Sequence, residues 1–170
     1  MSLPAKFFIL LALLSVAASG VRSGVKVGDQ FPPLAAPAVV SLNGAEVPAT
    51  AGSVVLVDFW ASWCGPCKAS FPALAKINAD YAARGLLIVA VGIDEKPAAA
   101  VAFWKKMAPP FSGVHDLRQT LVRQVVVPAM PTSYLLDRDG KIRFMHEGFH
   151  GAASDRDLRK EIETLLAEKN

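Results

Sequence analysis

Cysteine is scarce in this chain. Among 170 residues there are only two, Cys64 and Cys67, three positions apart. A zinc site takes about four ligands, and His146 and His150 could add two only from a distant segment, so we predict no metal centre. A disulfide that closes so short a loop constrains the unfolded chain little, which makes stability a weak reason for it. The pair therefore indicates redox chemistry that needs no cofactor beyond the two sulfurs.

An excess of charge of one sign is also lacking. The chain has 18 basic and 15 acidic residues, which gives a formal net charge of +3, and it has no run of Lys or Arg. This balance argues against nucleic acid as a partner. There is no Gly-rich phosphate loop, no sustained heptad pattern and no internal repeat. Because no dimer seam is evident, we expect a monomer.

The chain has only one long apolar run, which lies at its start. It extends from Phe7 to Ala18, after Lys6 and before the small residues Ser19 and Gly20. This order is typical of a secretory signal, and the run is shorter than the about 20 residues that span a bilayer. We predict a signal peptide over 1–20, one domain over 25–170 and a periplasmic location. An uncleaved N-terminal anchor is the alternative.

Strand and helix signals alternate along the rest of the chain. The predicted strands are 54–60, 86–93, 132–137 and 141–146, and the predicted helices run from the cysteines to about 84, over 97–107 and from Ser154 onwards. A β-hairpin is predicted over 38–50 around Asn43-Gly44, and a shorter element over 115–125. This order predicts a three-layer α/β fold with a central mixed sheet flanked by helices.

The cysteines directly follow the first buried strand, so Cys64-Gly65-Pro66-Cys67 begins a helix. The N–H groups and the dipole of a helix N-terminus stabilise a thiolate, which is the species that attacks disulfides. We therefore assign Cys64 as the exposed attacking nucleophile and Cys67, one turn inward, as the resolving thiol. Gly65 leaves the approach to Cys64 open, and Pro66 suits the first helical turn.

Asp58 is the single charge in the apolar run 54–60. A buried carboxylate without a partner is costly, and burial raises its pKa toward neutrality. Our hypothesis is that Asp58 accepts the proton of Cys67, directly or through one water. A solvated, inert Asp at a strand edge is the alternative.

The residues 57–68, VDFWASWCGPCK, resemble the active-site stretch of thioredoxin almost position for position. Pro72 resembles the proline of the active-site helix, and 130–132 the cis-proline segment. Gly140 resembles the hairpin glycine and Gly148 the glycine of the substrate groove. The resemblance extends over most of 25–170.

This resemblance implies a thioredoxin-like fold in which the Met130–Pro131 peptide bond is cis. It also implies a substrate groove around the cysteines, lined by residues that the motif identifies: Trp63, Gly65, Pro66, Met130, Pro131 and Gly148. An extended substrate chain would pair with the backbone at Met130. We expect Trp63 to shield the sulfur of Cys64 and Trp60 to belong to the core.

Val27-Gly28-Asp29 and an extra segment between Glu95 and Val127 are similar to the exported TlpA/ResA-like thioredoxins of bacteria. That similarity implies an inserted helical segment, reduction of protein disulfides, a membrane thiol-reducing electron donor and a link to cytochrome c maturation. Ser70 stands where that branch often has glutamate, and Val91 where thioredoxin has lysine, so we favour a broader reductase. A disulfide-forming oxidase, a copper- or haem-handling chaperone and a thioredoxin-fold adaptor are the alternatives.

Overall fold

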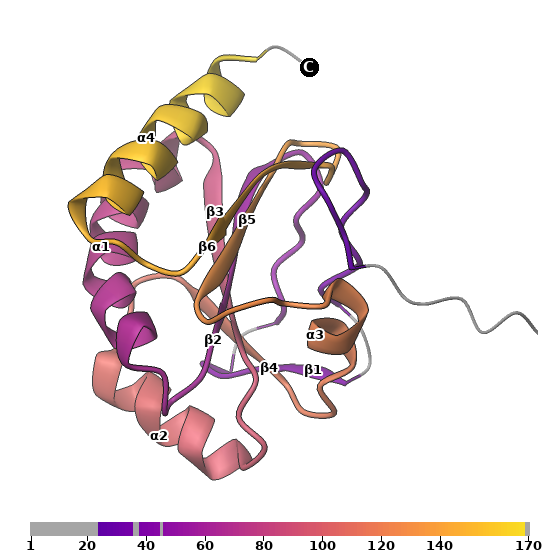
Figure 1. The fold of residues 1–170 in the computed structure, drawn as a ribbon, viewed down its shortest axis with the longest axis vertical. Helices are drawn as coiled ribbons and strands as arrows, with labels where there is room; N and C mark the ends of the chain where they lie inside the picture. Colours follow the sequence, from indigo (N-terminus) through magenta and orange to yellow (C-terminus); the bar gives the residue numbers. More distant parts are fainter. Residues whose placement is uncertain (1–23, 36–37, 45, 169–170) are drawn as a thin grey trace, which may run out of the picture.

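A six-stranded sheet with helices on both faces makes up the protein (Figure 1). The computed structural model describes residues 24–35, 38–44 and 46–168, so the predicted signal peptide lies outside the described residues. The strands are β1 Val39–Ser41, β2 Val54–Trp60, β3 Leu86–Gly92, β4 Ser112–Asp116, β5 Thr132–Leu136 and β6 Ile142–Glu147. The helices are α1 Gly65–Tyr81, a short 3-10 turn at Ala82–Arg84, α2 Pro97–Met107, α3 Thr120–Val125 and α4 Ala152–Ala167.

The sheet is mixed, as predicted, in the order β1-β4-β3-β2-β5-β6. The central strand β2 pairs in parallel with β3, and α1 makes the crossover between them. On its other edge β2 pairs antiparallel with β5, which forms a hairpin with β6. The carboxyl end of β2, where α1 begins, therefore lies at the same end of the sheet as the start of β5.

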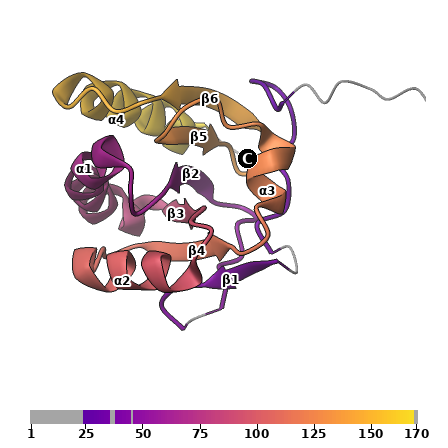
Figure 2. The same ribbon diagram turned by 60° about the horizontal axis from the view of Figure 1, so that its bottom comes forward.

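Alternation of side chains along the strands creates two separate cores. Val54, Leu56 and Trp60 of β2 pack on one face with apolar residues of α1, α2 and α4. Val55 and Val57 pack on the other face with α3 and the N-terminal segment. Figure 2 shows these helices on opposite sides of the sheet. The predicted three-layer thioredoxin-like α/β fold is confirmed.

The predicted N-terminal hairpin over 38–50 is wrong. The strand β1 pairs antiparallel with β4, which is distant in sequence, and the described residues 46–50 form no strand. The Asn43-Gly44 turn therefore does not join two paired strands among the described residues. The inserted segment between Glu95 and Val127 contains α2 and α3 as expected, but also the strand β4. The five residues of β4 include only one β-branched residue, Val114, so the sequence showed no strand pattern there.

The final helix begins two residues earlier than predicted, at Ala152. The hydroxyl of Ser154 accepts a hydrogen bond from the backbone N–H of His150, at 2.9 Å, and so does not cap its own helix. Within the part of the chain that the structure describes, no helix is both long and apolar enough to cross a membrane.

Candidate active site

The junction of β2 and α1 holds the two cysteines in a disulfide. Cys64 is the N-cap residue of α1, with extended backbone, and its Sγ accepts a hydrogen bond from the backbone N–H of Cys67 at 3.1 Å. The predicted contact between the helix N-terminus and the sulfur of Cys64 is thus present. Pro66 occupies the first turn, where its lack of an N–H costs nothing.

The exposure of the cysteines differs from our expectation. Cys64 is only 4% exposed, while Cys67 is completely buried, so Cys64 is the more accessible cysteine but not an exposed one. It lies in the apolar cluster between the sheet and α1, with its sulfur bonded to Cys67. Gly65 and Pro66 are exposed, and nothing lies within 4 Å of the position that a Cβ on Gly65 would take.

The two tryptophans near the site have different environments. Trp60 is fully buried and belongs to the core, as predicted. Trp63 is 68% exposed and therefore offers a large apolar surface beside the disulfide. An exposed side chain of this size is available for contact with a partner. Its predicted role in the groove stays a prediction.

Asp58 is buried in the centre of the sheet, with 1% of its surface exposed. It lies on the same face of β2 as Leu56 and Trp60, which is the face that packs against the cysteines. Burial raises the pKa of Asp58 from the usual 3.8 to about 7, against the opposing effect of a hydrogen bond from Ser133. The Ser133 hydroxyl donates to Oδ1 of Asp58 at 2.6 Å. The predicted burial and direction of the pKa shift are confirmed.

The Met130–Pro131 peptide bond is cis, as the resemblance implied. Thr132, which follows it, pairs with Phe59 near the end of β2, so this segment lies at the cysteine end of the sheet. Gly148, with a φ of 77°, donates its backbone N–H to the carbonyl of Pro131 at 2.7 Å. Pro131 and Gly148 are therefore brought together, while the function of the groove stays a prediction.

Sequence reasoning missed the groups that hold the loop before the cysteines. The buried carboxylate of Asp94 accepts hydrogen bonds from the backbone N–H and the hydroxyl of Ser62, at 2.9 and 2.5 Å. His115, to which we assigned no role, is buried with its Nε2 2.7 Å from the carbonyl of Asp94. In the sequence, the only indication of these hydrogen bonds was Asp94 itself, an acidic residue just after a buried strand.

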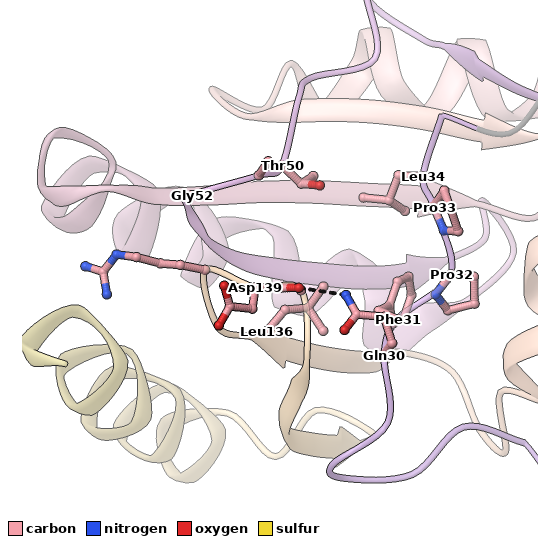
Figure 3. A pocket seen from close by; sticks show the side chains of 12 residues that line it. Gln30, Phe31, Pro32, Pro33, Leu34, Thr50, Gly52, Leu136 and Asp139 are labelled. Carbon is pink, nitrogen blue, oxygen red and sulfur yellow. Dashed lines mark hydrogen bonds between the residues drawn. The ribbon is translucent and has the colours of Figure 1, made fainter. Parts of the chain in front are cut away.

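One cavity adjoins the site and another lies far from it. A cavity of about 430 Å³ is lined by Trp63, Asp94 and Gln119 among others. A cavity of about 550 Å³ lies between the segment 30–34 and the turn that joins β5 to β6 (Figure 3). Since Leu136 pairs with Val55 at the start of β2, this second cavity is at the opposite end of the sheet from the disulfide.

The mixed sheet, the CxxC disulfide at the strand–helix junction and the cis-proline segment define a TlpA/ResA-like protein of the thioredoxin superfamily. Over residues 26–162 the chain matches the Redoxin family, and it belongs to that family.

Named relatives agree with this assignment. The chain is 32% identical over 91 residues to the thiol-disulfide oxidoreductase ResA of Bacillus thuringiensis, an alignment that covers 54% of this chain and 53% of the relative. The chain thus spans about half the length of that relative. It is 28% identical over 150 residues to ResA of Oceanobacillus iheyensis, covering 82% of this chain and 78% of the relative.

A solved structure is also similar. It is described as a putative thiol:disulfide interchange protein DsbE from Chlorobium tepidum. The identity is 36%, the TM-score is 0.74, and the match covers 85% of this chain and 100% of that one.

Proposed function

We propose that this protein is an exported thiol–disulfide oxidoreductase that reduces disulfides of other proteins. The observation that carries the proposal is the Cys64–Cys67 disulfide at the N-terminus of α1, above a face of the sheet that buries the carboxyl of Asp58. A pair that forms this bond reversibly exchanges two electrons with a substrate disulfide. The names of the similar ResA and DsbE proteins support thiol–disulfide exchange.

The reaction begins with the reduced pair. The Cys64 thiolate attacks one sulfur of a substrate disulfide, and the other substrate sulfur leaves as a thiolate. The Cys67 thiol then loses its proton and attacks Sγ of Cys64, which releases the second substrate thiolate. The substrate gains two electrons, and the protein leaves with the Cys64–Cys67 disulfide.

Asp58 supplies the base for the second step. Its carboxyl has a pKa of about 7, so near neutral pH it can accept the Cys67 proton and later release it. In the substrate complex, Trp63, Gly65 and Pro66 form one side of the groove, and the segment 130–131 with Gly148 forms the other. The substrate backbone pairs with Met130 in an extended conformation.

Export is supported by the sequence of residues 1–20, with its positive, apolar and small-residue regions. In an oxidising periplasm the pair must be reduced again after each turnover. We therefore propose a membrane thiol-reducing protein as electron donor and disulfides of exported proteins as substrates. Maturation of cytochrome c belongs among the candidate pathways.

The reduction potential of the Cys64–Cys67 couple tests the direction of electron flow. It is measured by equilibrating the protein with dithiothreitol or glutathione buffers and quantifying the free thiols. A value near that of thioredoxin, about −270 mV, supports a reductase. A value near that of DsbA, about −120 mV, reverses the direction and makes the protein a disulfide donor.

A further inference from the structure

One row of side chains across the sheet is polar where its neighbours are apolar. The strand register places Asp58 of β2 opposite Ser133 of β5, and Ser133 opposite His146 of β6. Residues paired in this way point to the same face of a sheet. The next row on that face consists of apolar side chains only, namely Leu56, Leu135 and Phe144.

Short hydrogen bonds occur at the two ends of this row. Among the described residues none joins Ser133 to His146, which face each other by strand register. The Ser133 hydroxyl donates to Oδ1 of Asp58 at 2.6 Å, while Oδ2 has no partner among the described residues. At the other end, Nε2 of His146 lies 2.6 Å from Oε2 of Glu161 on α4, which covers this face of the sheet (Figure 2). Each bond joins two different elements of the fold.

Exposure to solvent increases along the row. Asp58 is 1% exposed and Ser133 7%. The side chains of His146 and Glu161 are 21% and 19% exposed. The row therefore leads from a sealed carboxyl in the centre of the sheet to a pair of ionisable groups that water can reach.

A buried base needs such a connection. Once Asp58 has taken a proton from Cys67, its own surface offers almost no contact with water for releasing it. A serine hydroxyl both donates and accepts, so Ser133 can take a proton on one side and pass its own proton on at the other. Histidine exchanges protons with solvent near neutral pH.

We propose that Ser133, His146 and Glu161 form the proton route between Asp58 and solvent. The proton moves from Asp58 to the Ser133 hydroxyl, whose own proton crosses to Nδ1 of His146 through one water. His146 then releases a proton to bulk water, either directly or by way of Glu161, which passes it on to water. Charge balances, because each member returns to its initial protonation state. This inference rests on the proposed role of Asp58 in the reduction of disulfides.

Few other polar groups face Asp58 from the surrounding elements. On this face β2 itself contributes the indole N–H of Trp60, which is buried without a hydrogen-bond partner among the described residues and can only donate. The strand β3 contributes Ala90 as the paired neighbour, α1 contributes the cysteines, and α2 contributes the aromatic side chains of Phe103 and Trp104. Among the described residues, Ser133 is the only hydrogen-bond partner of the Asp58 side chain. The row through Ser133 is thus the polar path that the described residues provide.

The test uses the purified protein and the pH dependence of its reduction of a protein disulfide. Ser133→Ala removes the donor to the carboxylate, so the midpoint assigned to Asp58 should move about one unit to higher pH. Ser133→Thr keeps a hydroxyl and should restore the midpoint. His146→Ala should slow turnover about tenfold, and added imidazole should recover the rate.

The matched control is Glu163→Gln on the same helix. Glu163 also forms an ion pair, with Arg84 at 2.6 Å, but it is outside the row. This variant should turn over like the wild type and should not respond to imidazole. A loss of rate in His146→Ala that imidazole cannot recover would indicate a structural role and overturn the route.

Asp58→Asn separates failure of the route from failure of the function. If Asp58→Asn abolishes the pH midpoint while Ser133→Ala and His146→Ala turn over at the wild-type rate, the base stands and the route is wrong. If Asp58→Asn leaves the profile unchanged, Asp58 is not the base, and the route is wrong with it.

Discussion

The carboxyl of Asp58 should make the folded protein progressively less stable as the pH rises toward 7. Burial raises the pKa of Asp58 from 3.8 to about 7, so between these values the folded state keeps a proton that the unfolded state has released. Stability therefore falls as pH rises from about 4 and levels off above the folded pKa. At about 1.4 kcal/mol per pKa unit, the full cost is about 4 kcal/mol.

Replacing Asp58 with asparagine should remove this cost. The side chain keeps its shape and its acceptor for the Ser133 hydroxyl, but it cannot ionise. The free energy of unfolding of the variant, relative to the wild type, should then increase by about 4 kcal/mol between pH 4 and pH 8. At the lowest pH the variant should be the less stable protein, because the added N–H₂ group is buried without a partner.

The measurement is urea unfolding of the oxidised protein at several pH values, followed by circular dichroism. Asp157→Asn is the control, because Asp157 is exposed on α4 and its replacement should give a nearly constant difference. A difference between Asp58→Asn and the wild type that does not change with pH would refute the reasoning. It would mean that Asp58 is ionised in the folded protein throughout this range.

Two further predictions concern the resolving thiol and the packing of the sheet. Cys67→Ser should trap a mixed disulfide between Cys64 and the substrate, visible by mass spectrometry under non-reducing conditions, and no adduct should form with Cys64→Ser. Retention of function by Cys64→Ser would instead favour the adaptor. Gly113→Ala should lower the free energy of unfolding by about 1–3 kcal/mol, because a Cβ there would overlap the ring of Trp104. Gly65→Ala, with open space at its Cβ, should cause no such loss in the same urea titration, and equal losses would contradict the packing argument.

Local patterns were sufficient for the elements that form the centre of the fold. The run 54–60 is β2 as predicted, because a continuous apolar stretch with β-branched residues is typical of a strand buried on both faces. The helix α2 begins at Pro97 and ends at Met107, as the proline signals at its two ends predicted. The cysteine pair was equally local, since three positions separate two sulfurs that meet at a helix N-terminus.

Elements that depend on distant partners were missed or wrong. The strand β4 has little β propensity of its own and forms because β3 and β1 pair with it on either side. For the same reason the strand β1 could not be assigned its true partner from the Asn43-Gly44 turn. The burial of Cys64 also arises from packing between the sheet and α1, which the CxxC spacing does not specify.

The sequence by itself determined the chemistry of the site: a dithiol pair, a carboxyl in an apolar strand and a proline whose motif indicated a cis bond. Only the tertiary structure decided what surrounds those groups. The Asp94 carboxylate reaches the Ser62 loop from the end of β3, and Ser133 meets Asp58 across 75 positions of sequence. The bond between Ser133 and Asp58 follows from strand register, and register depends on how the whole sheet packs, so no local pattern in the chain encodes it.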